Sequence, residues 1–276
     1  MSAASTQQKK SKSSSLLRGE ERLSYLLLLP TMVILFAIAF YPLASVFYFS
    51  TTDRVFASAQ ETNFVGLENY KNSIELYITA VEQHPNDYEA AWKCARAHRE
   101  YADQAKKKGV EGWKDICAQF GKAGMQYAQK AIELKPERPD GHYYYGLNVG
   151  IYSDGVSILT ALSEGLKGKT QQAFEKTYEI NKMYKEGGPM LSLGRFWAVL
   201  PWPLRDRKKS LAYYREYQET KYFATNTEAQ LFLAELLIEM GGDKNKNEAK
   251  GYVENGLKSD DPYFVNMAKG LQSKLK

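Results

Sequence analysis

A spacing of small residues recurs along most of the chain and limits the folds that are open to it. Gly124 is followed four positions on by Ala128, then by Ala131 and by Pro136, and residues 73–85 repeat this spacing with Ser, Tyr, Ala and Pro. In a helix, residues at i, i+4 and i+7 share one face, and a proline ends the helix before the next one begins. The pattern therefore predicts helices that pack closely through faces of small residues.

The two copies also share a local phrase, which indicates the type of repeat. Residues 80–85 read Ala-Val-Glu-Gln-His-Pro and residues 131–136 read Ala-Ile-Glu-Leu-Lys-Pro. This phrase resembles the second helix of a tetratricopeptide repeat (TPR), a stacked unit of two helices. Ala95 and Gly146 then supply the small residues expected on the first helices. Weaker copies of the second helix follow, with the same spacing of i, i+4 and i+7. They are Thr170, Phe174 and Thr177, then Ser210, Tyr214 and Tyr217, and last Ala249, Val253 and Gly256.

These copies predict an all-α fold, a TPR-like α-solenoid over residues 73–276. We expect about four degenerate repeats with a half repeat in front, since the period departs from the usual length. The departures are insertions at 103–119, 151–168 and 185–206, where helices are longer or loops are added. A helical bundle without repeats is the alternative fold.

The N-terminal part predicts a membrane anchor. Residues 23–52 carry no charged side chain, and about 20 apolar residues suffice to cross a bilayer. We expect a transmembrane helix at 23–50 and a juxtamembrane linker at 51–72. Residues 1–22 are a basic tail with five Lys and Arg side chains, so the positive-inside rule keeps the tail in the cytoplasm. This places the repeats in the periplasm of a bacterial inner-membrane protein. Cleavage as a signal peptide at Ala57-Ser58-Ala59 is the alternative.

Part of this segment resembles a transporter family. Leu29-Pro30, Phe40-Tyr41-Pro42 and the stretch Asn-Phe-Val-Gly-Leu-Glu-Asn-Tyr at 63–70 are similar to the first span of sugar-type ABC transporter permeases. The resemblance covers about residues 17–72, and neither a second apolar span nor the family's coupling loop follows it. It implies an anchor of permease type, with a truncated or remodelled permease subunit as an alternative function.

The repeat region carries a second resemblance. Tyr143-Tyr144-Tyr145-Gly146, the phrase Gly-Gly-Pro-Met-Leu-Ser-Leu-Gly-Arg at 187–195 and the following Leu200-Pro201 are similar to the T component of TPR-associated TRAP transporters. Members of that family are periplasmic and pair with a substrate-binding protein. The resemblance implies an accessory of a solute transport system whose partner is a periplasmic substrate-binding protein.

Composition and motifs argue against several other classes of function. The net charge is only +5, and no stripe of Lys and Arg interleaved with aromatic residues indicates a nucleic-acid partner. The two cysteines, Cys94 and Cys117, have no metal-site spacing, although an exported chain could join them in a disulfide. No metalloprotease, serine-hydrolase or P-loop motif occurs. We therefore expect no catalytic residues, no metal, no cofactor and no enzymatic activity.

The first helices nevertheless predict a groove for a partner. Residues one turn apart on these helices face the concave side of a solenoid, and here they combine aromatic surface with arginine. Such a groove suits an extended peptide or an apolar ligand with a carboxylate. The alternative is that Trp92 and Tyr143 pack between repeats. The predicted groove residues are Trp92, Arg96, Arg99, Tyr143, Leu147, Leu191 and Arg195.

The sequence as a whole predicts a membrane-anchored, TPR-like binding or scaffold protein that assists a transport system. A general peptide-binding scaffold without any link to transport is a further alternative, because solenoids use one frame for many partners.

Overall fold

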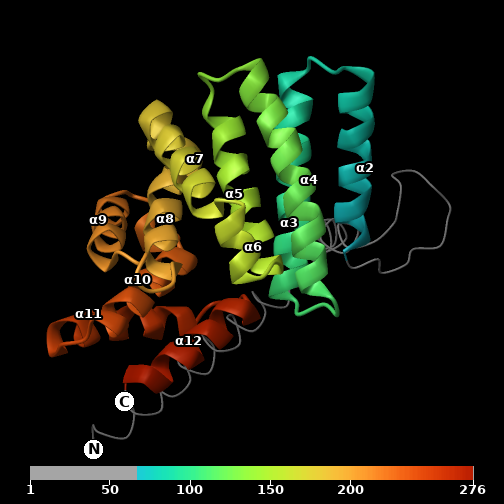
Figure 1. Ribbon diagram of the computed structural model, residues 1–276. Coiled ribbons are helices and arrows are strands. Elements are labelled where there is room, and N and C mark those ends of the chain that lie inside the picture. Colours follow the sequence, from blue (N-terminus) through green and yellow to red (C-terminus); the bar gives the residue numbers. More distant parts are fainter. Residues whose placement is uncertain (1–66, 276) are drawn as a thin grey trace, which may run out of the picture. The chain divides into compact units, whose positions relative to one another are not determined.

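The computed structural model describes residues 67–275, which are helical without a strand (Figure 1). The predicted anchor at 23–50 lies outside these residues. From Glu68 to Leu275, none of the helices combines the length and apolar character that a membrane crossing requires. The helices are α2 (Glu68–Gln83), α3 (Tyr88–Lys107), α4 (Trp113–Leu134), α5 (Pro139–Gly155), α6 (Ile158–Ser163), α7 (Leu166–Asn181), α8 (Tyr184–Val199), α9 (Arg207–Gln218), α10 (Thr227–Met240), α11 (Asp243–Leu257) and α12 (Pro262–Leu275), with a short 3₁₀ turn at Phe223–Thr225.

The helices pack in sequential pairs. Helix α3 packs on α4, α5 on α7, α8 on α9 and α10 on α11. Helix α2 precedes the first pair, and α12 closes the array against α10 and α11. The prediction of an all-α array of helix pairs is confirmed for the described part of the chain, including the half repeat in front.

Side-chain caps begin several of these helices. The Asp87 carboxylate accepts hydrogen bonds from the backbone N–H groups of Glu89 and Ala90 at the start of α3. Asp206 caps α9 and Asn226 caps α10 in the same way. Such caps satisfy N–H groups that have no partner within the helix, so the sequence sets these boundaries locally.

The small residues of the predicted repeats lie where neighbouring helices meet. Ala95, Ala128, Ala131, Ala234 and Ala249 are all fully buried. A Cβ atom at Gly146 would lie 2.6 Å from a ring carbon of Phe174, and one at Gly194 would lie 2.5 Å from a ring carbon of Tyr214. In the α5–α7 and α8–α9 pairs, therefore, an aromatic ring of the second helix packs on a glycine of the first. The front copy is looser, because Ser73 is exposed.

The three predicted insertions take three different forms. Residues 103–119 lengthen α3 and α4, and residues 151–168 contain the additional helix α6. Residues 185–206 contain a kink at the start of α8, where Lys185, Glu186 and Gly187 have φ of 47°, 61° and 86°, followed by the loop that leads to α9. Left-handed backbone is unfavourable for Lys185 and Glu186, so the surrounding packing must hold this kink.

Both cysteines are buried and free, in separate clusters. Cys94 packs with Val81 and Ala90, and Cys117 packs with Ala102 and Ile151. Burial raises the pKa of the Cys94 thiol to about 12 and that of the Cys117 thiol to about 11. Both are therefore neutral packing groups at physiological pH, and the disulfide considered from the sequence is not formed.

The contact of Gly146 with Phe174 gives a first prediction. Gly146→Ala should destabilise the protein by about 1–3 kcal/mol, because the added methyl group overpacks a buried ring. Gly150→Ala is the matched control in the same helix, since no atom lies within 4 Å of its added Cβ atom. That change should stabilise by up to about 1 kcal/mol, the difference in helix propensity. Urea unfolding followed by circular dichroism measures both, and equal effects would contradict the packing described for α5 and α7.

Candidate functional site

Three buried nitrogen donors on α3 lack a hydrogen-bond acceptor. They are Nε1 of Trp92, Nε of Arg96 and Nε of Arg99, and they make up half of the buried side-chain N and O atoms without a partner in the described part of the chain. Their spacing of i, i+4 and i+7 places them on one face of the helix. Buried donors without acceptors cost about 1–3 kcal/mol each. Because the Arg96 and Arg99 side chains keep 30 % and 29 % exposure, this face is the strongest candidate for contact with acceptor groups of another molecule.

Aromatic rings support this face from below. The Trp92 indole stacks on the Tyr144 ring of α5, with 5.6 Å between centroids and 11° between planes. The Arg96 guanidinium lies over the Trp92 ring at 5.4 Å from the centroid. Burial raises the pKa of Tyr144 to about 12, so its hydroxyl stays neutral. The Trp92–Tyr144 stack is thus neutral, and the positive charge beside it belongs to the Arg96 guanidinium.

The two arginines are only loosely paired within the chain. Arg96 Nε lies 3.6 Å from a Glu100 oxygen, and Arg99 Nη2 lies 3.5 Å from an Asp103 oxygen. The side chains of Arg96 and Arg99 are 30 % and 29 % exposed. Guanidinium groups at such distances retain N–H donors for a second, closer acceptor.

A buried carboxylate beside this face joins three helices. Asp140 of α5 accepts hydrogen bonds from the Tyr88 hydroxyl of α3 at 2.7 Å and from the Tyr184 hydroxyl of α8 at 2.8 Å. Burial, and then these bonds to Asp140, raise the pKa of both tyrosines, so both remain donors. Arg138 adds a weaker contact at 3.4 Å. The carboxylate therefore fixes the positions of the first helices relative to one another.

Other predicted groove residues serve mainly in packing. The Tyr143 ring packs edge-on against Tyr184, with 5.3 Å between centroids, and burial raises its pKa. Leu147 is half-buried against the α3–α4–α5 cluster. Leu191 is half-buried against the cluster formed by α8 to α12. These three side chains keep partial exposure, and whether they contact a partner stays a prediction.

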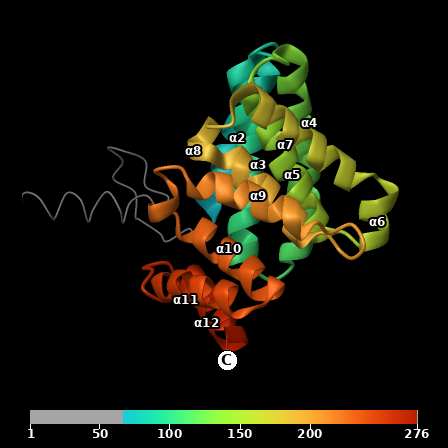
Figure 2. The ribbon, with the colours of Figure 1, turned by 90° about the vertical axis from the view of Figure 1, so that its left-hand side faces the viewer.

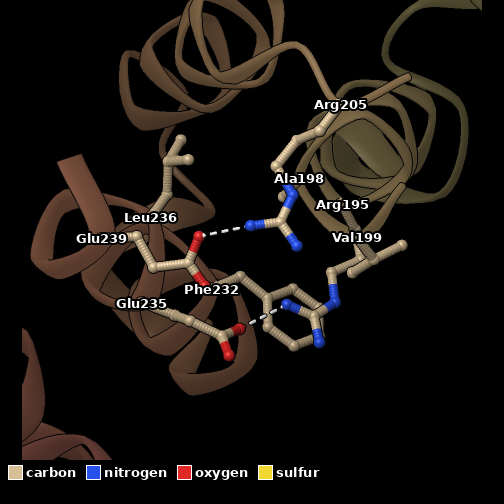
Figure 3. Close-up of a pocket in the computed structure, with 8 residues that line it drawn as sticks. All are labelled: Arg195, Ala198, Val199, Arg205, Phe232, Glu235, Leu236 and Glu239. Atoms are coloured by element: carbon tan, nitrogen blue, oxygen red, sulfur yellow. Dashed lines mark hydrogen bonds and ion pairs between the residues drawn. The ribbon is translucent and has the colours of Figure 1, made fainter. Parts of the chain in front are cut away.

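Arg195 lies in a different place, a small pocket between α8 and α10 of about 160 Å³ (Figure 3). It forms an ion pair with Glu235, and its guanidinium carbon lies 4.2 Å from the Phe232 ring centroid. At the other side, Arg205 Nη1 lies 2.9 Å from a Glu239 oxygen. Because each arginine has a glutamate, the pocket presents little net charge to a ligand.

The predicted residues thus fall into two groups. Trp92, Arg96 and Arg99 share one face of α3, as their spacing predicted, whereas Arg195 belongs to the separate pocket. Of the two interpretations left open for Trp92, its 8 % exposure fits packing between repeats. Its N–H group and the two arginines remain the candidate contacts.

Sequence reasoning missed the residues that organise the site. Asp140 directly follows Pro139 at the start of α5, a position that suggests an exposed acidic first turn. Tyr184 falls just before a predicted insertion. Only the buried position of Asp140, at 6 % exposure, reveals its role.

The histidines offer no alternative centre. His98 is buried between the rings of Phe120 and Tyr127, its Nδ1 lies 2.9 Å from the Cys94 carbonyl oxygen, and burial lowers its pKa. His142 Nε2 lies 2.8 Å from the Pro136 carbonyl oxygen. Between residues 67 and 275, no group of three His, Cys, Asp or Glu side chains has the geometry to hold a metal ion.

Removing the Asp140 carboxylate tests its role. Asp140→Ala should destabilise the protein by about 2–4 kcal/mol, because the two buried hydroxyls of Tyr88 and Tyr184 lose their acceptor. Asp140→Asn keeps one acceptor oxygen and should cost less. Asp115→Ala, at an exposed site in the first turn of α4, is the control and should stay within about 1 kcal/mol of the parent chain. Urea unfolding measures all three, and equal losses for Asp140→Ala and Asp115→Ala would exclude the joining role.

Comparisons with known proteins bear on the fold and the family. The family model described as regulator of microtubule dynamics protein 1-3 matches residues 55–196, a span that includes the α3 face and Asp140. The crystal structure of TTC0263, a thermophilic TPR protein in Thermus thermophilus, is similar with a TM-score of 0.52 and 18 % identity. The similarity covers 76 % of this chain and 92 % of that chain, and at this identity it shows the TPR-like fold. No curated protein matches. Neither similarity supports the two transporter resemblances.

Proposed function

This chain belongs to the family described as regulator of microtubule dynamics protein 1-3, and on that premise we propose that its TPR-like array is a protein-interaction scaffold. The observation that carries the proposal is the face of α3 on which Arg96 and Arg99, partly exposed and only loosely paired, lie with Trp92. A TPR-like fold favours this role, because stacked helix pairs offer a long surface to partners.

The chemistry of the face indicates what it would bind. Arginine presents its N–H groups in a planar fork that matches a carboxylate, and Arg96 and Arg99 lie one turn apart. The Trp92–Tyr144 stack below adds apolar surface. An extended peptide segment with acidic side chains provides both acceptors and length. The family's description makes tubulin the first partner to test.

The proposed role is binding and not catalysis. Asp140, the buried carboxylate next to the face, uses its two oxygens to accept hydrogen bonds from Tyr88 and Tyr184. A general base needs a free oxygen within reach of a substrate proton. The absence of a cofactor remains part of the proposal.

Binding of tubulin by the full chain gives the next prediction. Arg96→Ala/Arg99→Ala should weaken the interaction at least tenfold, because charged hydrogen bonds contribute about 1.5–3 kcal/mol each and about 1.4 kcal/mol corresponds to a factor of ten. Lys244→Ala/Lys246→Ala changes two exposed charges on α11 and is the matched control. Sedimentation with polymerised microtubules and titration with soluble tubulin measure the effect.

The two possible failures of this experiment have different meanings. If the parent chain binds neither form of tubulin, the partner is wrong. If it binds and the arginine variant binds equally well, the α3 face is wrong and the scaffold must use another surface.

The membrane anchor and the location are further proposals that rest on sequence alone. We propose that residues 23–50 cross a bacterial inner membrane once, with residues 1–22 in the cytoplasm. A periplasmic array could not meet a cytoplasmic partner such as tubulin, so this location and the tubulin interaction are alternatives that exclude each other. The transport-accessory and permease alternatives rest on the short phrases that resemble those families, whereas a general peptide scaffold also fits the fold.

A reporter fused to the C-terminus distinguishes a periplasmic array from a cytoplasmic one. If the positive-inside rule holds, alkaline phosphatase fused after Lys276 should be active in a bacterial host, because it folds only after export. A green fluorescent protein fusion at the same site is the control and should stay dark. The reverse pattern would place the array in the cytoplasm and reject the predicted orientation.

A further inference from the structure

Two connecting segments at one end of the array form an exposed edge. Successive helices run in opposite directions, so the segments after α5 and after α8 lie at the same end (Figures 1 and 2). The first contains α6 and the second is the loop 200–206 between α8 and α9. Both fall within insertions that lengthen the repeat, and neither is needed for the stacking of helix pairs.

Distances confirm that the two segments are neighbours. Lys167 in the first turn of α7, just after α6, lies with its Nζ 5.4 Å from the Trp197 ring centroid. Lys209 in the first turn of α9, just after the loop, lies with its Nζ 4.4 Å from the same ring centroid. Helix α6 and the α8–α9 loop therefore flank one indole of α8.

This edge gathers the apolar side chains that the array leaves in solvent. Five of the eight large hydrophobic residues exposed in the described part of the chain lie here. Trp202 is 90 % exposed between Pro201 and Pro203, whose rings restrict the backbone of the loop. Leu159 is 74 % exposed on α6. The five are Ile158, Leu159, Leu162, Val199 and Trp202.

The charge around these side chains is positive. Residues 157–169 and 199–209 hold six Lys and Arg side chains against two carboxylates, those of Glu164 and Asp206. Asp154, at the end of α5, forms an ion pair with Lys106 at 2.6 Å. Arg207 is ion-paired with Glu239 at 3.6 Å, so the basic side chains nearest the edge are Lys167, which is half-buried, and Lys208 and Lys209, which are exposed.

We propose that this edge, which we call the α6 edge, docks onto an anionic lipid surface. Protruding apolar side chains enter the boundary between headgroups and acyl chains, and Lys and Arg around them attract anionic headgroups. Tryptophan favours this boundary, because its ring is apolar and its N–H group stays in contact with water. The inference goes beyond the proposed scaffold role and uses neither the α3 face nor residues 23–50.

The shape and charge of the edge favour lipid over a protein partner. Four of the five apolar side chains stand on a short helix and a protruding loop and line neither pocket described for the array, while Val199 also lines the pocket that contains Arg195. A protein partner would need a surface that is both apolar and acidic. A lipid surface supplies both properties in layers, with anionic headgroups above the acyl chains.

Quenching of tryptophan fluorescence by brominated phosphatidylcholine tests the proposal on the full chain. The chain has four tryptophans, and residues 1–66 contain none, so a predicted anchor adds no signal. With vesicles that also contain phosphatidylserine, we expect clear quenching that falls at high salt. Trp202→Phe should remove most of it. With vesicles of phosphatidylcholine alone, quenching should be at least twofold weaker.

Matched charge variants complete the experiment. Lys208→Glu/Lys209→Glu should reduce quenching on the anionic vesicles at least twofold. Lys244→Glu/Lys246→Glu makes the same change on exposed α11 positions and should leave the quenching as in the parent chain. All four lysines are exposed, but Lys209 also contacts the Trp197 ring, so urea unfolding of both variants beside the parent chain separates a docking defect from a folding defect.

Two results would overturn the proposal. Quenching that is the same for the parent chain and Trp202→Phe, or the same on neutral and anionic vesicles, would mean that the α6 edge does not meet anionic lipid. A dimer seen by light scattering without vesicles, and converted to a monomer by Leu159→Ser, would assign the edge to contact between two copies of the chain instead.

Discussion

The contact between an aromatic ring and a glycine decides how closely the helices approach in the two central pairs, α5–α7 and α8–α9. Phe174 and Tyr214 occupy the space that a side chain would fill at Gly146 and Gly194. Because interiors are packed as densely as crystals, even one added methyl group at these sites requires the helices to move apart. The stacking of pairs, and with it the alignment of the first helices, depends on this approach.

Within that frame, polar groups set the positions of the first helices. A buried carboxylate is costly unless hydrogen bonds satisfy it, and Asp140 meets this condition through tyrosines of two other helices. Arg195 and Glu235 likewise satisfy each other's charge in an ion pair. Trp92, Arg96 and Arg99 differ, since their Nε1 and Nε atoms are buried without acceptors. Asn148, Trp197 and Tyr214 also have a buried atom without a partner, but they lie on three different helices, whereas the three donors of α3 share one face.

The two proposed surfaces come from different parts of the repeat. The α3 face is formed by a first helix, whose position the stacking fixes. The α6 edge is formed by connecting segments, which can change without disturbing the stacked pairs. A repeat protein can therefore add a second contact surface at the ends of its helices while it keeps the first. The insertions at 151–168 and 185–206 illustrate this division.

Helix pairs and their small-residue faces follow from the sequence, because a 3.6-residue period and the prolines after α2 and α4 are local signals. The shared face of Trp92, Arg96 and Arg99 follows for the same reason. Short phrases such as residues 187–195 did not point to the family whose model matches residues 55–196. Only the tertiary structure joined Asp140 to Tyr184 and Arg195 to Glu235, which are 44 and 40 residues apart. Such pairs depend on how repeats stack, and that register comes from the packing of whole helices rather than from any one segment.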